Sequence, residues 1–357
     1  MITERTRERY AEMQDLLARH SQRGRWLVLT HDNPDPDSLA AAAALNVLLR
    51  KTFKRRVTIA YGGIIGRAEN RQMVRTLRLS LSHLRHLNWK NYRHFALVDC
   101  QPGTGNNQFP DHLCPDLVFD HHPMRRATRD AQFADIRTNY GATATILAEY
   151  MEAAGLAISK ENATALLYAI VTETQDFRRE YSSADRAMYD TLRPLSDFRA
   201  LAKIQSPPLR LEYFHTLRRA VEGMATVSTL IISHLGPVDQ PDIVPEVADL
   251  LLRLEGKTWS LCTGTFKDRL YLSVRTTNPS GDAGRLMRRL LGRRGKGGGH
   301  GMIAGGWMSV EDADKGKIET LQNRLAVRLA KMLKKNPDRL QPIQWDKIVE
   351  KRPEESK

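Results

Sequence analysis

The stretch Asp-Leu-Val-Phe-Asp-His-His-Pro at residues 116–123 decides how the rest of the chain is interpreted. Residues 117–119 are apolar, too few for a helix and typical of a buried strand. The run ends on Asp120, His121 and His122. Three polar side chains at the mouth of a buried strand are costly unless something binds them, and a metal ion is the usual binder. Alone, the tripeptide favours a simple hydrogen-bonded Asp–His pair in a loop, so the metal hypothesis depends on the rest of the chain.

The same pattern, a buried strand that ends on polar residues, occurs at two earlier places. The apolar run 26–30 precedes His-Asp-Asn-Pro-Asp-Pro-Asp at 31–37, with Ser38 as the predicted N-cap of a helix. Residues 95–98 precede Asp99 in the same way. Helical segments lie between these strands. This alternation predicts an α/β fold, mainly a parallel sheet with helices on both faces.

The carboxyl ends of parallel strands meet at one edge of a sheet, where ligands bind. His31, Asp35 and Asp37 would therefore lie near Asp99 and residues 120–122. In an extended loop, the alternation of Asp35 and Asp37 would point both carboxylates the same way. Carboxylates gathered in this way repel one another, and divalent cations relieve the repulsion. Oxygen ligands with one or two imidazoles suit Mn²⁺ or Mg²⁺.

The second half of the chain predicts another, smaller α/β domain. The first domain would cover residues 1–205, and a linker helix at 206–225 would follow the break Ser206-Pro-Pro. A second domain at 226–335 would start with a strand at 227–232 and contain a glycine-rich loop. Residues 336–357 would form a polar tail.

Composition limits the classes of function. A chain of 357 residues with 41% hydrophobic and 27% charged residues is typical of a soluble globular protein. Its charged N-terminus and the absence of a long apolar run predict no signal peptide and no membrane span. Three scattered cysteines predict a reduced, cytoplasmic location and argue against a zinc ribbon. The net charge of +14 favours a polyanionic partner, with nucleic acid or nucleotides first. A homodimer is left open.

Taken together, the motifs resemble the DHH phosphoesterase family with its DHH-associated C-terminal domain. The residues that carry the resemblance are the 31–37 segment, Asp99, Asp-His-His at 120–122 and Gly-Gly-Gly-His at 297–300. The resemblance implies a two-domain hydrolase of phosphoesters or phosphoanhydrides that uses two divalent ions, with Mn²⁺ preferred. It also implies an active site in the cleft between the domains.

Individual roles also follow from the resemblance. His31 and Asp35 would bind one metal, Asp37 and His121 the other, and Asp99 both. Asp120 and His122 would be catalytic-site residues that orient these ligands. The family usually has Asp-Thr-Gly at the end of a later helix, where this chain has Glu173 in Thr-Glu-Thr-Gln-Asp-Phe. Glu173 would therefore complete the second metal site, with Asp176 as the fallback ligand.

The substrate would be held by the second domain. The resemblance assigns a phosphate-binding arginine to Arg275, and an anion-binding loop to Gly297, Gly298, Gly299 and His300. Six Lys or Arg residues and one acid lie between Gly281 and Met302, although a solvated helix face explains them equally well.

The expected substrates are short 5′-phosphorylated oligoribonucleotides, with 3′-phosphoadenosine 5′-phosphate as a second substrate. A phosphodiesterase for cyclic or linear dinucleotides is the alternative. A nucleotide- or RNA-binding sensor without activity is the alternative from another class. The clustered carboxylates argue against a pure binder because clustering them is electrostatically unfavourable.

Overall fold

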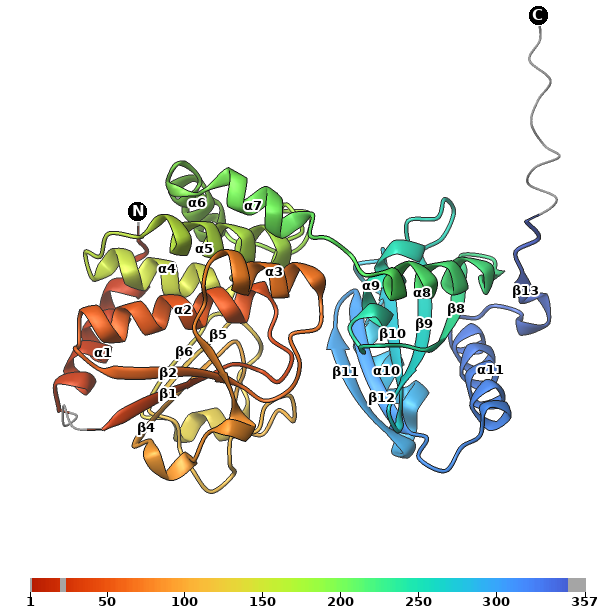
Figure 1. Cartoon of the computed structure of the whole chain (residues 1–357), viewed down its shortest axis with the longest axis horizontal. Helices are drawn as coiled ribbons and strands as arrows, with labels where there is room; N and C mark the ends of the chain where they lie inside the picture. The colour runs from red at the N-terminus through yellow and green to blue at the C-terminus, as the bar shows by residue number, and fades with distance from the viewer. Residues whose placement is uncertain (1, 20–23, 346–357) are drawn as a thin grey trace, which may run out of the picture. The chain divides into compact units, whose positions relative to one another are not determined.

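The computed structural model describes residues 2–19 and 24–345 and divides the chain into two compact units, Met1–Pro208 and Leu209–Lys357. Each unit has its own sheet and its own hydrophobic core (Figure 1). Within the described residues, every helix is too short or too polar to cross a membrane. The two units are described separately below.

The first unit is built on a six-stranded sheet in which all neighbouring strands are parallel. Its strands are β1 (Arg25–Leu29), β2 (Arg56–Tyr61), β3 (Leu81–His83), β4 (His94–Val98), β5 (Leu117–Asp120) and β6 (Phe133–Ile136). Their order is β3-β2-β1-β4-β5-β6, so the direction of winding reverses between β1 and β4. Such a switch point is where open α/β sheets bind ligands. The mainly parallel α/β fold predicted from the sequence is confirmed.

The helices of the first unit share one core with one face of this sheet (Figure 1). They are α1 (Glu4–Arg19), α2 (Pro36–Lys51), α3 (Ala68–Thr76), α4 (Thr143–Ala153), α5 (Lys160–Glu173), α6 (Ser183–Leu192) and α7 (Phe198–Gln205). The alanine-rich α2 packs closely against α4 and α5, since small side chains let helices approach. The other face is covered by the short 3₁₀ turns at Leu84–His86 and Trp89–Asn91 and by a loop that contributes Phe109, so the α-helices predicted on both faces lie on one face only among the described residues.

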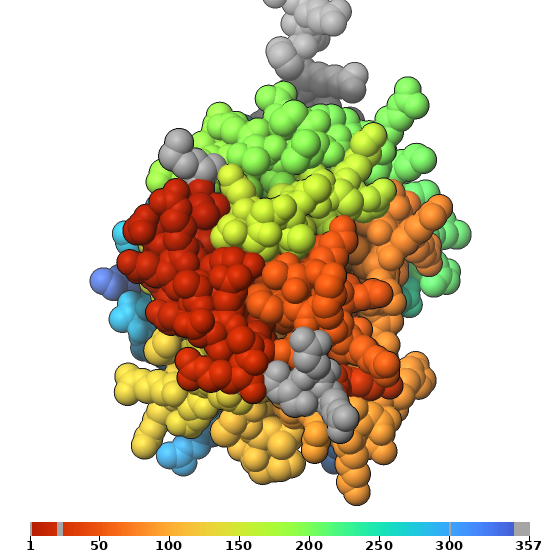
Figure 2. Space-filling view, turned by 90° about the vertical axis from the view of Figure 1, so that its left-hand side faces the viewer, coloured from red at the N-terminus to blue at the C-terminus, as the bar shows by residue number. Residues whose placement is uncertain are grey.

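The N-terminal helix is anchored by a buried polar network as well as by its apolar face. Arg137, fully buried, donates to Asp135 at 2.6 Å, to Glu149 at 2.7 Å and to the hydroxyl of Thr6 at 2.8 Å. Thr6 lies in α1 and Glu149 in α4, and the two helices are in contact. Figure 2 shows the red N-terminal segment lying directly against the orange and yellow-green parts of this unit.

The second unit contains a seven-stranded mixed sheet. Its strands are β7 (Ala225–Val227), β8 (Leu230–Pro237), β9 (Trp259–Phe266), β10 (Arg269–Thr276), β11 (Gly295–His300), β12 (Ile303–Ser309) and β13 (Gln341–Pro342). The order is β11-β12-β10-β9-β8-β7-β13, and only β8 and β9 among these neighbours are parallel. One core lies between the sheet and α8 (Leu211–Glu222) and α9 (Ile243–Leu251). The other lies under α10 (Ala283–Leu291) and α11 (Lys315–Met332).

Four sequence-based predictions differ from the structure. The strand expected at 227–232 is the end of β7 and the start of β8, because the chain turns at Ser228, whose φ is +51°. The glycine-rich loop is strand β11. The linker helix is α8, which packs against β8 in the second unit. The expected polar tail includes β13, which pairs with β7, while residues 346–357 lie outside the described residues.

Candidate metal centre

Three strand ends of the first sheet bring their polar residues together around Asp99. Its Oδ2 lies 3.6 Å from His31 Nε2, and its Oδ1 lies 3.7 Å from His121 Nε2. Asp99 directly follows β4 and has a φ of +56°, a left-handed conformation that non-glycine residues seldom adopt outside functional sites. Two groups of potential metal ligands share this carboxylate: His31, Asp35 and Asp99 form one, and Asp99, His121 and His122 form the other.

Asp35 has a structural task in addition to its place in the cluster. It is the N-cap of α2, where its Oδ1 accepts the Ser38 backbone N–H at 3.0 Å, and Ser38 Oγ lies 3.1 Å from the Asp35 N–H. The prediction of Ser38 as the cap was therefore wrong, and α2 begins at Pro36. Burial would raise the pKa of Asp35, but hydrogen bonding and charge from His31 and Ser38 hold it well below its usual range.

Asp37 lies in the first turn of α2, so the extended loop predicted to align Asp35 with Asp37 does not form. Its two carboxylate oxygens accept the backbone N–H groups of Thr143 at 2.8 Å and Ala144 at 2.7 Å. These N–H groups belong to the start of α4, where the helix dipole favours negative charge. Asp37 Oδ2 lies 3.9 Å from His121 Nε2.

His121 carries the clearest evidence for a bound cation. Its Nδ1 lies 3.2 Å from the carbonyl oxygen of Tyr140, which can only accept, so Nδ1 carries the proton. Its Nε2 is therefore a lone pair directed toward the carboxylates of Asp37 and Asp99. This atom is buried and has no hydrogen-bond partner among the described residues. A lone pair facing two carboxylates fits a divalent metal and no protein donor.

The electrostatics of the cluster also favour a cation. Burial raises the pKa of Asp99 well above its usual range, and the charges of Asp37 and Asp35 add to the shift. Burial, then the charge of Glu173, raises the pKa of Asp37 likewise. Burial lowers the pKa of His121 to about 4, so this imidazole is neutral at physiological pH. A divalent cation would stabilise the ionised forms of these carboxylates.

Glu173, not Asp176, is the acid of the later helix that interacts with the cluster. It is the last residue of α5 and is half-buried, and its charge raises the pKa values of both Asp37 and Asp99. Burial, then the charge of Asp35, raises the pKa of Glu173 to about 7. Asp176 is exposed, in a turn where residues 175–177 all have positive φ. These charge effects favour Glu173 over Asp176 for the second ion, and its role as a ligand stays a prediction.

Asp120 and His122 form a hydrogen-bonded pair at the rim. His122 Nδ1 lies 2.9 Å from Asp120 Oδ1, which also accepts the His122 backbone N–H at 3.1 Å. Burial opposes the charged form of His122, but the hydrogen bond and charge of Asp120 outweigh it and raise the pKa of His122 to about 9. His122 Nδ1 also lies 3.8 Å from Asp99 Oδ1, which places His122 in metal-binding range beside its predicted supporting role.

Sequence reasoning missed Gln101, which holds this turn in place. Its Nε2 donates to Asp120 Oδ2 at 2.7 Å, while its Oε1 accepts the Arg125 N–H at 2.7 Å and the Thr128 hydroxyl at 2.8 Å. Its only sequence signal is its position two residues after Asp99. Thr143 was also missed, because it lies far along the chain from Asp99. Its hydroxyl donates to Asp99 Oδ1 at 3.1 Å.

The residues predicted to bind substrate all lie in the second unit. Arg275 is buried in β10, where its Nε donates to Asp249 at 2.8 Å and one Nη donates to two backbone carbonyls. This guanidinium therefore already has protein partners. Gly297, Gly298 and Gly299 lie in β11 and pair with β12. His300 ends this strand, and its side chain lies outside the described residues.

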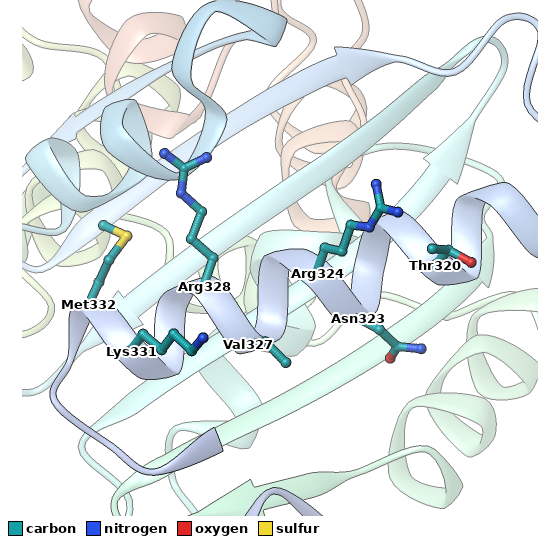
Figure 3. A pocket seen from close by; sticks show the side chains of 7 residues that line it. All are labelled: Thr320, Asn323, Arg324, Val327, Arg328, Lys331 and Met332. Carbon is teal, nitrogen blue, oxygen red and sulfur yellow. The ribbon is translucent and has the colours of Figure 1, made fainter. Parts of the chain in front are cut away.

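A separate surface hollow of about 600 Å³ runs along α11. Its lining comes from that helix alone: Thr320, Asn323, Arg324, Val327, Arg328, Lys331 and Met332. In Figure 3 the arginine side chains point to one side of the helix, and Asn323 and Val327 point to the other. The hollow contains none of the predicted site residues and offers no converging ligand set.

Comparisons with known proteins agree with this geometry. Residues 25–170 match the model of the DHH family, N-terminal domain. An uncharacterized protein of Methanocaldococcus jannaschii is 33% identical over 276 residues, which are 77% of this chain and 56% of that protein. The chain thus spans little more than half the length of this curated relative.

Solved structures show the same fold at low sequence identity. An exopolyphosphatase-related protein from Bacteroides fragilis has a TM-score of 0.71 at 12% identity, covering 94% of this chain and 99% of that one. The DHH domain of a member of the s1p family of ribosomal proteins has a TM-score of 0.50 at 13% identity, covering 92% and 91%.

Proposed function

The chain carries the N-terminal domain of the DHH family, and from that premise we propose that it is a metal-dependent phosphoesterase with two divalent ions, preferably Mn²⁺. The observation that carries the proposal is the buried lone pair of His121 Nε2, which faces the carboxylates of Asp37 and Asp99 without a donor. A carboxylate shared by two ligand groups supports two ions rather than one.

The chain's own residues would hold and orient these ions. His31, Asp35 and Asp99 would hold one ion; Asp99, His121, Asp37 and Glu173 would hold the other. Tyr140 fixes the tautomer of His121 through its carbonyl oxygen. The bound ions would supply Lewis-acid polarisation of the phosphoryl group and an activated water. His122, kept in place by Asp120, would order the rim of the site.

We further propose that the substrates are short 5′-phosphorylated oligoribonucleotides, with 3′-phosphoadenosine 5′-phosphate as a second substrate. The net charge of +14 supports a polyanionic substrate. Exposed basic residues of the segment 285–296 add local positive charge next to the glycine strand. Arg275, Gly297–Gly299 and His300 remain the predicted contacts of the second unit.

The test is hydrolysis by the purified full chain in Mn²⁺ and in EDTA. The panel contains 5′-phosphorylated diadenylate, a 5′-phosphorylated 20-mer, 3′-phosphoadenosine 5′-phosphate, cyclic diadenylate and polyphosphate. We expect the highest kcat/KM for the phosphorylated dinucleotide and no turnover in EDTA. Fastest turnover of the cyclic substrate would favour the cyclic dinucleotide alternative. Nucleotide binding without turnover of any compound would favour a sensor.

A further inference from the structure

A short segment at the start of α4 makes several of the hydrogen bonds that support the candidate metal centre. Residues 140–145, which we call the anchor segment, are all buried. Its first carbonyl oxygen bonds His121 Nδ1 at 3.2 Å. The first two N–H groups of α4 donate to the two carboxylate oxygens of Asp37, and a threonine hydroxyl donates to Asp99. This one stretch of chain therefore orients three predicted metal ligands.

The three supported residues are predicted ligands of the second ion, and with the acid of α5 they complete its set. The contact with the shared Asp99 also lies on this side. The Thr143 hydroxyl donates to Asp99 Oδ1, which lies 3.7 Å from His121 Nε2. Asp99 Oδ2 lies on the other side, 3.6 Å from His31 Nε2. Asp35, a predicted ligand of the first ion only, is held from within α2 instead. The anchor segment thus supports mainly the second ion.

Asp185 fixes the anchor segment near both of its ends. It is fully buried in the first turn of α6. Its Oδ2 accepts the Gly141 N–H at 2.7 Å, and its Oδ1 accepts the Thr145 hydroxyl at 2.6 Å. Oδ2 also accepts the N–H and the hydroxyl of Ser182, both at 2.7 Å, in the capping box that starts α6. One buried side chain therefore joins the start of α6 to the segment that orients the ligands.

Gly141 brings the anchor segment close to the turn that follows α5. A Cβ at this position would lie 2.6 Å from Thr174 Cγ2, 3.1 Å from the Glu180 carbonyl oxygen and 3.3 Å from Asp185 Oδ2. A residue with a side chain would displace at least one of these neighbours, so the close approach requires glycine. Thr174 directly follows Glu173, the acid of α5 that is predicted to complete the second ion's ligand set.

We propose that Asp185 and Gly141 are positioning residues for the second metal ion. Asp185 holds the anchor segment in place, and Gly141 lets the segment lie against the turn after Glu173. The segment in turn sets the directions of the ligands that it bonds, as residues behind metal ligands do. Asp185 lies beyond residues 25–170, the part of the chain that matches the family model. The proposal rests on the proposed function, because it presumes two bound ions.

The test is calorimetry of Mn²⁺ binding to the purified full chain. Asp185→Ala removes the acceptor of the Gly141 N–H, so one ion should bind roughly 10–100-fold more weakly while the other keeps its wild-type affinity. Asp185→Asn keeps an oxygen for this N–H, and its amide can donate to the Thr145 hydroxyl, so it should recover most of the loss. A residue that only started α6 would not favour one ion over the other.

Two double variants identify which ion is affected. If Asp185→Ala weakens the second ion, the remaining ion is held by His31 and not by His121. Adding His31→Ala to Asp185→Ala should therefore abolish the remaining tight binding, and adding His121→Ala should leave it. The opposite result would assign Asp185 to the first ion and overturn the proposal.

Gly141→Ala tests the anchor segment from its other side. Its methyl group would collide with Thr174 Cγ2, so we expect the same selective loss of one ion. Thr174→Ser removes this Cγ2 and keeps the hydroxyl, which donates to the Ile170 carbonyl at 2.6 Å. The double variant Gly141→Ala/Thr174→Ser should therefore bind the second ion more tightly than Gly141→Ala alone. If Asp185→Ala fails to fold by circular dichroism, this pair decides the question.

Asp197→Ala is the matched control. Asp197 caps α7 in the same unit, where its Oδ1 accepts the N–H groups of Arg199 at 2.9 Å and Ala200 at 3.0 Å. The variant loses an aspartate at a helix start but keeps the anchor segment intact, so both ions should bind as in the wild type. Equal weakening of both ions by Asp185→Ala and Gly141→Ala, or wild-type affinity for both, would overturn the proposal.

Failure of this proposal and failure of the proposed function give different results. A wild type that binds two Mn²⁺ ions and hydrolyses phosphoesters, with variants that lose neither ion selectively, would overturn the positioning role alone. A wild type that binds fewer than two ions would overturn the two-ion function, and the positioning role with it.

Discussion

His121 shows at the scale of one residue why the strand ends of the first unit are polar. Its ring is fixed by the Tyr140 carbonyl, its pKa is lowered to about 4 by burial, and its Nε2 has no donor among the described residues. Each property alone is compatible with a buried histidine. Together with the facing carboxylates of Asp37 and Asp99, they support the proposed role of His121 as a metal ligand.

The choice between Glu173 and Asp176 is the first testable consequence at this scale. Glu173→Gln should weaken the binding of one of two Mn²⁺ ions by roughly 10–100-fold, because its charge acts directly on Asp37 and Asp99. Asp176→Asn, in the exposed turn, is the matched control and should leave both affinities unchanged. Isothermal calorimetry measures both. The reverse order of effects would make Asp176 the ligand.

The raised pKa of Glu173 has a pH-dependent consequence for the metal-free protein. Its folded value is about 7 against an ordinary 4.5, so the folded state binds the proton more tightly. Its contribution to stability is therefore fully present below about pH 4.5 and is lost as the pH rises through 7. In EDTA, the Tm of the wild type relative to Glu173→Gln should fall between pH 4.5 and 7.

Thermal unfolding followed by circular dichroism measures this difference. Groups whose pKa values Glu173 does not affect, such as His121, shift both proteins alike and cancel in the comparison, whereas Asp37 and Asp99 contribute to the measured difference. Excess Mn²⁺ should stabilise the wild type more than the variant at pH 7, since the ion favours the ionised carboxylate. A Tm difference that stays constant from pH 4.5 to 7 would show that the pKa of Glu173 is not raised in the folded protein.

At the scale of elements, the turn after β5 depends on a contact that no local pattern reveals. Gln101 bonds Asp120, Arg125 and Thr128 at once. Gln101→Leu would leave several buried polar groups unpaired, each costing roughly 1–3 kcal/mol. We expect about 3 kcal/mol lower free energy of unfolding and Mn²⁺ binding weakened by roughly 10–100-fold.

Urea denaturation and calorimetry give the two quantities for Gln101→Leu. Gln72→Leu is the control, since Gln72 lies half-buried on α3 and its side chain donates to the Thr76 hydroxyl of the same helix. Its stability should change by less than about 0.5 kcal/mol. A stable Gln101→Leu protein with unchanged metal affinity would mean that His122 needs no support from Gln101.

Elements with a strong local signal could be predicted from the sequence, and those defined by distant partners could not. The apolar runs at β1, β4 and β5 predict their strands. The break at Ser228 carries no glycine or proline, so the β7–β8 turn gave no signal. Strand β11 was missed because its glycines form a strand only through pairing with β12.

The residues of the candidate site also fall into those that the sequence could predict and those that it could not. His31, Asp99 and His121 could be placed together because parallel strands end at one edge of the sheet. The position of Asp37 could not, since it depends on the start of α4, more than a hundred residues later. The contact of Arg275 with Asp249 could not be predicted either, because Asp249 lies in helix α9 and Arg275 in strand β10.

At the scale of the whole molecule, the two units divide the chemistry. The first gathers acids and imidazoles around Asp99, and the second presents bare strand backbone, an aromatic ring and cations. Under the proposed function, the first unit would bind the divalent ions and the second would contact the substrate.

The central claim is that Asp99 binds two metal ions that are required for hydrolysis. The most direct test is calorimetry of Mn²⁺ binding to the full chain, with hydrolysis of 5′-phosphorylated diadenylate measured in parallel. The wild type and Asp111→Asn, an exposed control, should bind two ions and turn over substrate. Loss of a residue that only supports a metal ligand weakens metal binding by roughly 10–100-fold. Asp99→Asn should weaken Mn²⁺ binding by more than this, and its hydrolytic activity should fall to background. Two ions bound at wild-type affinity by Asp99→Asn, with wild-type turnover, would contradict the account.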